Sequence, residues 1–336
     1  MTPTRGAIVL GAIVLAVVAQ VFLRSFFVSA GVLGIGLAVI VACPAIVGGA
    51  RALRTSLPLP HPRAIDIVTA VTATMGSLFL ARSMGIPELV TAAIVLSAFG
   101  VAALPGGPLD ALAAGGGYAG AFVGILTPDV RLGWYWVAGA GALAGLLWTL
   151  IGPSVLPGVG GRIGLVALMG SGGVYWVASL TGEESTPVLL PGMDGVAHWS
   201  VIPIGAAGAV ITWLLINRLG WGLNLASGLP ALAVCGVIAM SGVDPAAVLA
   251  TAFFGGTFVG GTAPARLPHA GWLGAAGLLY GALRLRFTGP LQGHVGGGGV
   301  SAAIAVRAVI GVGAIASRCT SRTRSKAMWA RSAPSP

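Results

Sequence analysis

Charged residues are scarce in this chain, and their scarcity excludes a water-soluble fold. Only 8% of the 336 residues are charged, whereas 56% are hydrophobic and the mean hydropathy is +0.97. A chain of this composition has too little polar surface to cover a water-soluble body. We therefore expect an all-α integral membrane protein that contacts the lipid bilayer. At roughly 20 apolar residues per span, its length allows about 12 transmembrane helices.

Cysteine is rare, and the common catalytic motifs are missing. The three cysteines, Cys43, Cys235 and Cys319, show neither metal-ligand spacing nor a paired framework. The sequence contains no HExxH zinc motif, no GxSxG nucleophile elbow and no phosphate-binding Walker loop. We therefore expect no enzymatic activity, no metal and no cofactor.

Basic residues outnumber acidic ones by 18 to 8, which gives a formal net charge of +10. Five of the basic residues lie in the last twenty positions, and three lie in the loop from Arg51 to Arg63. Such clusters mark the cytoplasmic side of membrane proteins. No platform of interleaved aromatic residues accompanies them, so we expect no nucleic-acid partner. The pattern predicts a multi-pass protein of the plasma (inner) membrane with cytoplasmic N- and C-termini.

Residues 78–147 and 214–283 match each other without a gap at an offset of 136. About 21 of the 70 aligned positions are identical, whereas composition alone gives roughly one in ten. The clearest stretch sets 120–124 against 256–260. Identical pairs flank it on both sides: Arg82 and Arg218, Pro128 and Pro264, Trp136 and Trp272, Gly141 and Gly277, and Gly145 and Gly281. The match predicts an internal duplication.

Apolar runs separated by short polar or Pro/Gly breaks predict the organisation of the chain. Two N-terminal segments with a basic loop occupy 1–60, repeat 1 occupies 61–182, an acidic linker 183–198, repeat 2 199–316, and a basic disordered cytoplasmic tail 317–336. Repeat 1 offers spans near 65–81, 89–104, 110–126, 134–151 and 163–180. Repeat 2 offers spans near 199–216, 223–241, 247–262, 271–285 and 299–316. Five spans per copy would invert the second copy relative to the first.

Two features leave alternatives open. The first apolar segment is either an uncleaved helix or a signal peptide cleaved after Ala30, and Arg24 favours the helix because it interrupts the region that a signal peptide keeps uncharged. The Gly-rich segments near 110–126 and 247–262 are either full spans or re-entrant hairpins buried in protein. With hairpins, each repeat has four spans and the two halves are parallel.

Small residues recur at helical spacing in both copies. The first ridge consists of Gly116, Gly120 and Gly124, and the second of Ala252, Gly256 and Gly260. Glycines on one helix face let a neighbouring helix approach closely, within the chain or in a homo-oligomer. Alternatively, glycine lets a helix break and expose carbonyl groups to a solute, as in discontinuous transporter helices.

Each ridge ends at a polar break that contains a proline. Thr127 and Pro128 follow the first ridge, and Thr262 and Pro264 follow the second. Because proline has no amide proton, it leaves a helix carbonyl in need of another partner. That partner is water, a solute or another helix.

A few ionisable residues fall near the predicted spans. Arg131 and Arg266 follow the two breaks, as interfacial anchors or as cationic gates on opposite faces. Asp66 and Asp110 open spans, so we expect them at the interface, where an acid complements a helix N-terminus. Arg307 is the most internal basic residue, and it should face protein or water instead of lipid.

These features predict a transporter or channel for a small neutral or anionic solute, with the pathway between two homologous halves. The expected lining consists of Gly120, Phe122, Gly124, Thr127 and Pro128 with Gly256, Phe258, Gly260, Thr262 and Pro264. The shortage of buried acids favours passive or weakly coupled transport. The alternative is a non-transporting scaffold or assembly subunit whose glycine ridges bind partner helices. A pathway predicts a polar cavity where the repeats meet, and a scaffold predicts a dry core.

Overall fold

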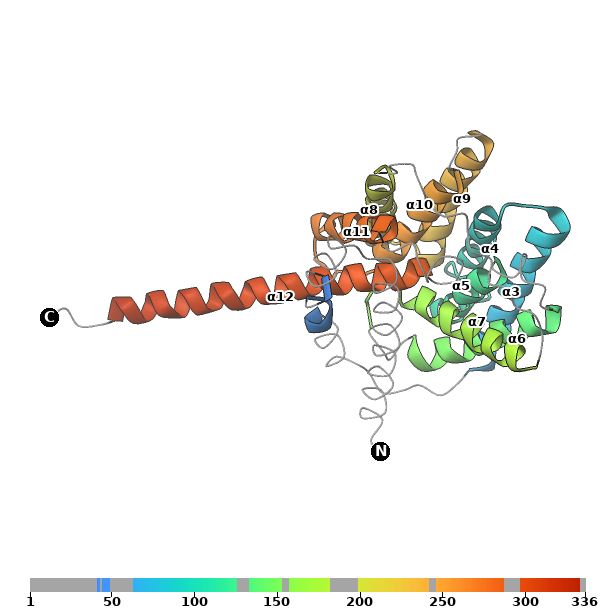
Figure 1. Ribbon diagram of the computed structural model, residues 1–336, viewed down its shortest axis with the longest axis horizontal. Coiled ribbons are helices and arrows are strands. Elements are labelled where there is room, and N and C mark those ends of the chain that lie inside the picture. The colour runs from blue at the N-terminus through green and yellow to red at the C-terminus, as the bar shows by residue number, and fades with distance from the viewer. Residues whose placement is uncertain are drawn as a thin grey trace, which may run out of the picture.

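The computed structural model describes residues 41–42, 44–48, 63–125, 133–152, 157–181, 199–241, 246–286 and 297–332 (Figure 1). In this part of the chain the long regular elements are ten α-helices, and no β-strand occurs. Their bounds are α3 Ala64–Met84, α4 Glu88–Ala102, α5 Ala111–Ile125, α6 Trp134–Ile151, α7 Arg162–Leu180, α8 Val201–Leu219, α9 Leu223–Ser241, α10 Ala246–Gly260, α11 Ala270–Arg286 and α12 Gly297–Ser332. Each of the ten apolar segments of the predicted repeats coincides with one of these helices, whereas most of the two N-terminal segments lies outside the described residues.

Four helices are long and apolar enough to cross a membrane. They are α3, α8, α9 and the Gly297–Ser317 part of α12. These helices agree with the expected helical membrane protein. Twelve spans remain a prediction, because the other helices are shorter or less apolar.

The helices α5 and α10 are short but continuous, so neither turns back within its own residues. Each has 15 residues. At 1.5 Å of rise per residue such a helix is about 22 Å long, less than the roughly 30 Å of a hydrocarbon core. Each would cross the core only together with the segment that follows it.

Two groups of helices pack in the same way. In the first group α3 lies against α5 and α6, and α7 also contacts both of these helices. In the second group α8 lies against α10 and α11, and α12 contacts both in turn. Figure 1 shows α3 to α7 beside α8 to α11. The pairs α4 with α9 and α7 with α12 join the two groups.

The α9 helix continues through a proline. Pro230 lies inside it, so the carbonyl of Ala226 lacks its usual intrahelical donor. The hydroxyl of Thr212 on α8 donates to this carbonyl at 3.4 Å. A hydrogen bond between helices thus takes the place of one within α9.

The last helix extends beyond the bundle. Residues 297–317 of α12 pack among the other helices, and Figure 1 shows the rest of α12 pointing away from them. The tail from residue 317, which we expected to be disordered, is helical as far as Ser332.

Candidate functional site

Both glycine ridges face a neighbouring helix of the same chain. A Cβ atom on Gly120 would overlap the carbonyl oxygen of Ala70 on α3, and one on Gly256 would overlap the carbonyl oxygen of Gly205 on α8. Gly124 and Gly260 approach α3 and α8 in the same way. The ridges therefore bind helices within the chain, so they do not offer a face to a second copy or to a partner.

Threonine hydroxyls add hydrogen bonds to the first of these crossings. Thr69 Oγ1 donates to the Ala113 carbonyl at 2.9 Å, and Thr74 Oγ1 donates to the Gly120 carbonyl at 3.0 Å. Both carbonyls belong to α5. Such hydrogen bonds between helices contribute about 0.6 kcal/mol each in membrane proteins, so close backbone packing accounts for most of the contact.

Four aromatic rings of α5 and α10 form a further contact between the two helix groups. Phe122 and Phe258 have ring centroids 4.9 Å apart. Tyr118 stacks on Phe258 at 5.6 Å, and Phe254 meets Phe122 edge-on at 5.0 Å. All four side chains are buried. The expected pathway residues Phe122 and Phe258 are thus brought together, but in direct ring contact where we expected a polar cavity.

A few hydroxyl groups lie beside these rings. Tyr118 Oη is buried and interacts with the hydroxyls of Ser227 and Thr257. Thr257 is also fully buried, and its hydroxyl donates to the Phe254 carbonyl at 2.7 Å. The hydroxyls of Tyr118, Ser227 and Thr257 therefore make this edge of the ring cluster the polar part of the contact.

The chain leaves the helical path after α10 and stays attached to the loop before α7. The Gly161 amide donates to the Phe258 carbonyl at 3.1 Å, and the Gly160 amide donates to Thr262 Oγ1 at 3.2 Å. Thr262 is buried, whereas Pro264 is exposed. Sequence reasoning missed the partner loop, whose only signal was its glycines, two of which, Gly158 and Gly161, have positive φ.

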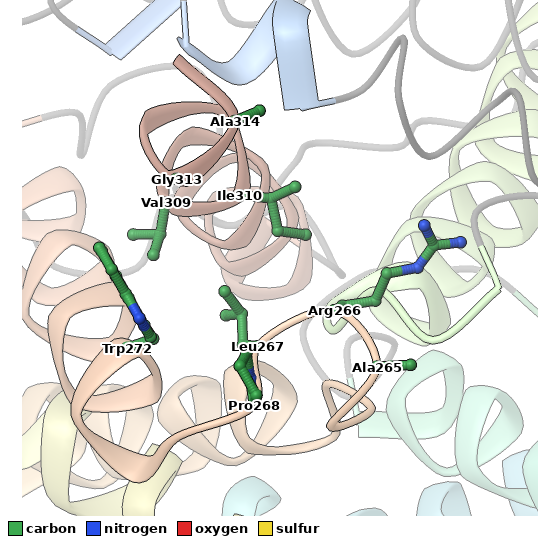
Figure 2. A pocket seen from close by; sticks show the side chains of 9 residues that line it. All are labelled: Ala265, Arg266, Leu267, Pro268, Trp272, Val309, Ile310, Gly313 and Ala314. Atoms are coloured by element: carbon green, nitrogen blue, oxygen red, sulfur yellow. The ribbon is translucent and has the colours of Figure 1, made fainter. Parts of the chain in front are cut away.

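A pocket of about 270 Å³ opens beside this break (Figure 2). Arg266, Leu267 and Trp272 line one side, and Ile310, Gly313 and Ala314 of α12 line the other. In Figure 2 the guanidinium of Arg266 points away from Trp272. Its Nε donates to the Pro157 carbonyl at 3.1 Å. Arg266 thus holds the two loops together at the edge of the pocket.

Asp66 lies in the first turn of α3, and its side chain is buried by other parts of the chain. Its Oδ2 accepts a hydrogen bond from Thr149 of α6 at 3.2 Å, and its Oδ1 lies 3.7 Å from Arg63. Arg63 donates to Asp110 at 2.6 Å, and this bond raises the pKa of Arg63. One cation and two acids therefore tie the starts of α3 and α5 to the end of α6. Asp110 also caps α5 by accepting from the Ala113 amide at 2.8 Å.

Two arginines are buried in the second group of helices. Arg307 of α12 has 3% of its surface exposed, and Arg284 of α11 has 4%. Nε of each, and Nη2 of Arg307, have no hydrogen-bond partner. The sequence prediction that Arg307 faces away from lipid agrees with this burial.

Family models, curated proteins and solved structures give no match to this chain. Its function must therefore follow from the chemistry of its own residues. Of the predicted lining, the two phenylalanines meet each other, the glycines face α3 and α8, and Thr262 binds the loop before α7. Thr127, Pro128 and the possible gate Arg131 lie outside the described residues.

Proposed function

We propose that this chain is an integral membrane transporter or channel for a small neutral or anionic solute, with its pathway between two homologous halves. The contact of α5 with α10 carries the proposal. Tyr118 and Phe254 occupy equivalent positions of the repeats, as do Phe122 and Phe258. Exchanging the two copies therefore converts the pair Tyr118–Phe258 into the pair Phe254–Phe122. Both pairs are in contact.

The proposed halves are α3 to α7 and α8 to α12, related by a pseudo-twofold axis. The contacts between the groups support this, because α4 meets α9 and α7 meets α12, and each of these pairs joins equivalent helices. Gly100 approaches Leu225 and Gly228 approaches Ser97, so α4 and α9 run antiparallel. Two halves related in this way commonly enclose the substrate site of a transporter.

The helix ends refine the alignment of the repeats. Gly85 and Gly220 both cap their helices in the left-handed conformation, with amides bound to the carbonyls of Leu80 and Leu215. Gly85 and Gly220 are 135 positions apart, as are Leu80 and Leu215. This offset is one fewer than the offset of 136 in the later helices. Arg82 and Arg218 are therefore one position out of register. A single-residue insertion between α8 and α10 accounts for the change.

In the proposed mechanism the stacked rings are the closed position of the pathway. Opening requires α5 and α10 to part, and both helices are short and followed by a polar break. Irregular backbone such as Gly261–His269 is tolerated at membrane depth only where protein or a water-filled cavity surrounds it. The pocket beside Arg266 is the part of the pathway that stays open in the closed state.

A scaffold without transport is the second candidate. The close packing of the four rings favours it, because a scaffold needs no opening between its halves. The sequence suggested a scaffold whose glycine ridges bind partner helices. The ridges do not support that version, because helices of the same chain cover them. Access of water to the break separates the two candidates.

Cysteine accessibility tests the pathway. We expect Thr127→Cys and Thr262→Cys, in a chain whose native cysteines are replaced by alanine, to react with an aqueous methanethiosulfonate reagent in liposomes. Thr262 is buried in the closed state, so its reaction rate should fall between those of exposed Ser83→Cys and buried Ala93→Cys. Protection of both positions under all conditions would remove the pathway and favour the scaffold.

Reporter fusions test the inverted arrangement. Five spans per copy place the loops at Gly85 and Trp221 on opposite sides of the membrane. A phosphatase reporter, active outside, and a fluorescent reporter, active inside, should therefore give opposite results at the two positions. Identical results at both would leave parallel halves and exclude an axis in the membrane plane.

A further inference from the structure

Arg307 presents one edge of its guanidinium without a partner. Nε and Nη2, the two nitrogens that lack hydrogen bonds, share the edge of the group that faces away from Cδ. This edge donates two parallel N–H bonds, the geometry that matches the two oxygens of a carboxylate. Arg307 lies near the middle of the Gly297–Ser317 span. The free edge is therefore inside the bundle.

Burying a cation of this kind without an anion raises the free energy of the folded state. The effective penalty of burying an ion is several kcal/mol, and proteins offset it with a counter-charge. In the part of the chain that the structure describes, the acids are Asp66, Glu88 and Asp110, and the ion pairs of two of them go to Arg63. None of the three pairs with Arg307. Buried Arg284 adds a second positive charge to the same group of helices.

The position of Arg307 on α12 connects it with the candidate site. Ala303, four residues earlier, touches Gly161 of the loop that binds Phe258 and Thr262. Ile310, three residues later, lines the pocket beside Arg266. Residues three and four apart lie on one face of a helix. Arg307 therefore lies on the same side of α12, one turn from the loop and one turn from the pocket wall, and the pocket itself is lined by its neighbours Val309 and Ile310 and not by Arg307.

We propose that Arg307 binds the anionic group of the transported solute, and that this group is a carboxylate that enters by the pocket. The inference rests on the proposed function and narrows it from a neutral or anionic solute to a carboxylate. The guanidinium edge holds both oxygens, and the solute supplies the counter-charge that the described residues do not give. The apolar pocket wall of Leu267, Ile310 and Trp272 accepts the rest of a small solute.

Thermal melting of the purified full chain in detergent tests the site, with formate, acetate, lactate and succinate as probes against chloride at equal ionic strength. We expect at least one carboxylate to raise the Tm of the wild type, because a ligand of the folded state stabilises it. The half-saturating concentration should rise at least tenfold in Arg307→Gln. It should stay unchanged in Arg284→Gln, which removes the other buried arginine. Arg307→Lys, which keeps the charge but loses the two-nitrogen edge, should bind at least tenfold more weakly as well.

The Tm without ligand shows whether Arg307 has only a structural role. Arg307→Gln removes an unpaired buried charge, so its unliganded Tm should equal or exceed that of the wild type. A large drop, or full carboxylate binding by Arg307→Gln, overturns the inference. So does the absence of any carboxylate effect on the wild type. If liposomes that contain the protein pass glycerol while no carboxylate raises its Tm, this inference fails and the transport proposal stands. If a carboxylate binds but no solute crosses the liposome membrane, and the cysteines at the break stay protected, the transport proposal fails.

Discussion

Replacing Gly120 by leucine is expected to lower the free energy of unfolding by more than about 3 kcal/mol, at or above the usual cost of overpacking. Even a Cβ atom at this position would overlap the Ala70 carbonyl, and a backbone atom cannot move aside as a flexible side chain can. The α3 and α5 helices must then separate along their whole crossing. Reversible unfolding in mixed micelles with increasing dodecyl sulfate measures the change.

Two further substitutions give this prediction its controls. Gly256→Leu meets the Gly205 carbonyl in the equivalent crossing, so its cost should be similar. Gly139→Leu enters open space, with nothing within 4 Å of its added Cβ. It should be neutral or slightly stabilising, because leucine is the better helix former by up to about 1 kcal/mol. Equal effects of Gly120→Leu and Gly139→Leu would show that α5 does not pack on α3 as described.

Removing one ring from the contact between α5 and α10 is expected to have the second large effect. Phe122→Ala should cost about 3–5 kcal/mol of unfolding free energy, and Phe258→Ala a similar amount, because each leaves a cavity among buried rings. Their centroids are 4.9 Å apart, so the two losses should not be additive. A double-mutant cycle should give a coupling of about 0.5–3 kcal/mol between them.

An aromatic residue on the outside of the bundle provides the matched control. Phe79 of α3 has 59% of its surface exposed, and its replacement by alanine should change the stability by less than about 1 kcal/mol. The cycle of Phe79 with Phe258 should show no coupling. A coupling of zero between Phe122 and Phe258 would contradict the ring contact on which the proposed pathway rests.

The sequence predicted the helices well because membrane helices follow a simple rule. Long apolar runs with polar ends form helices, since every backbone group must find a partner within lipid. The chain offered ten such runs in the two repeats, and each became a helix. Phe122 and Phe258 were also identified, because identical residues mark both copies of the repeat. Tyr118 and Phe254 were missed, because the alignment sets a tyrosine against a phenylalanine and so gives no identity.

Contacts between distant residues could not be predicted from one sequence. Asp66 looked like an interfacial residue, since an acid in the first turn of a helix has a local explanation. Its Oδ2 accepts a hydrogen bond from Thr149, which lies 83 residues away. In the same way, the partner of Thr262 is Gly160, 102 residues earlier. Periodicity reports which face of a helix is apolar, but not which helix covers it.

The burial of α5 has a consequence for the influence of the membrane on this protein. Residues 113–125 are all buried by other parts of the chain, so this stretch meets no lipid tails. Bilayer thickness and tail saturation then act on α5 only through the helices around it, such as α3 and α6. Other helices, and not lipid tails, surround the centre of the molecule. Changes in acyl chains should alter how the outer helices tilt before they alter the contact between the rings.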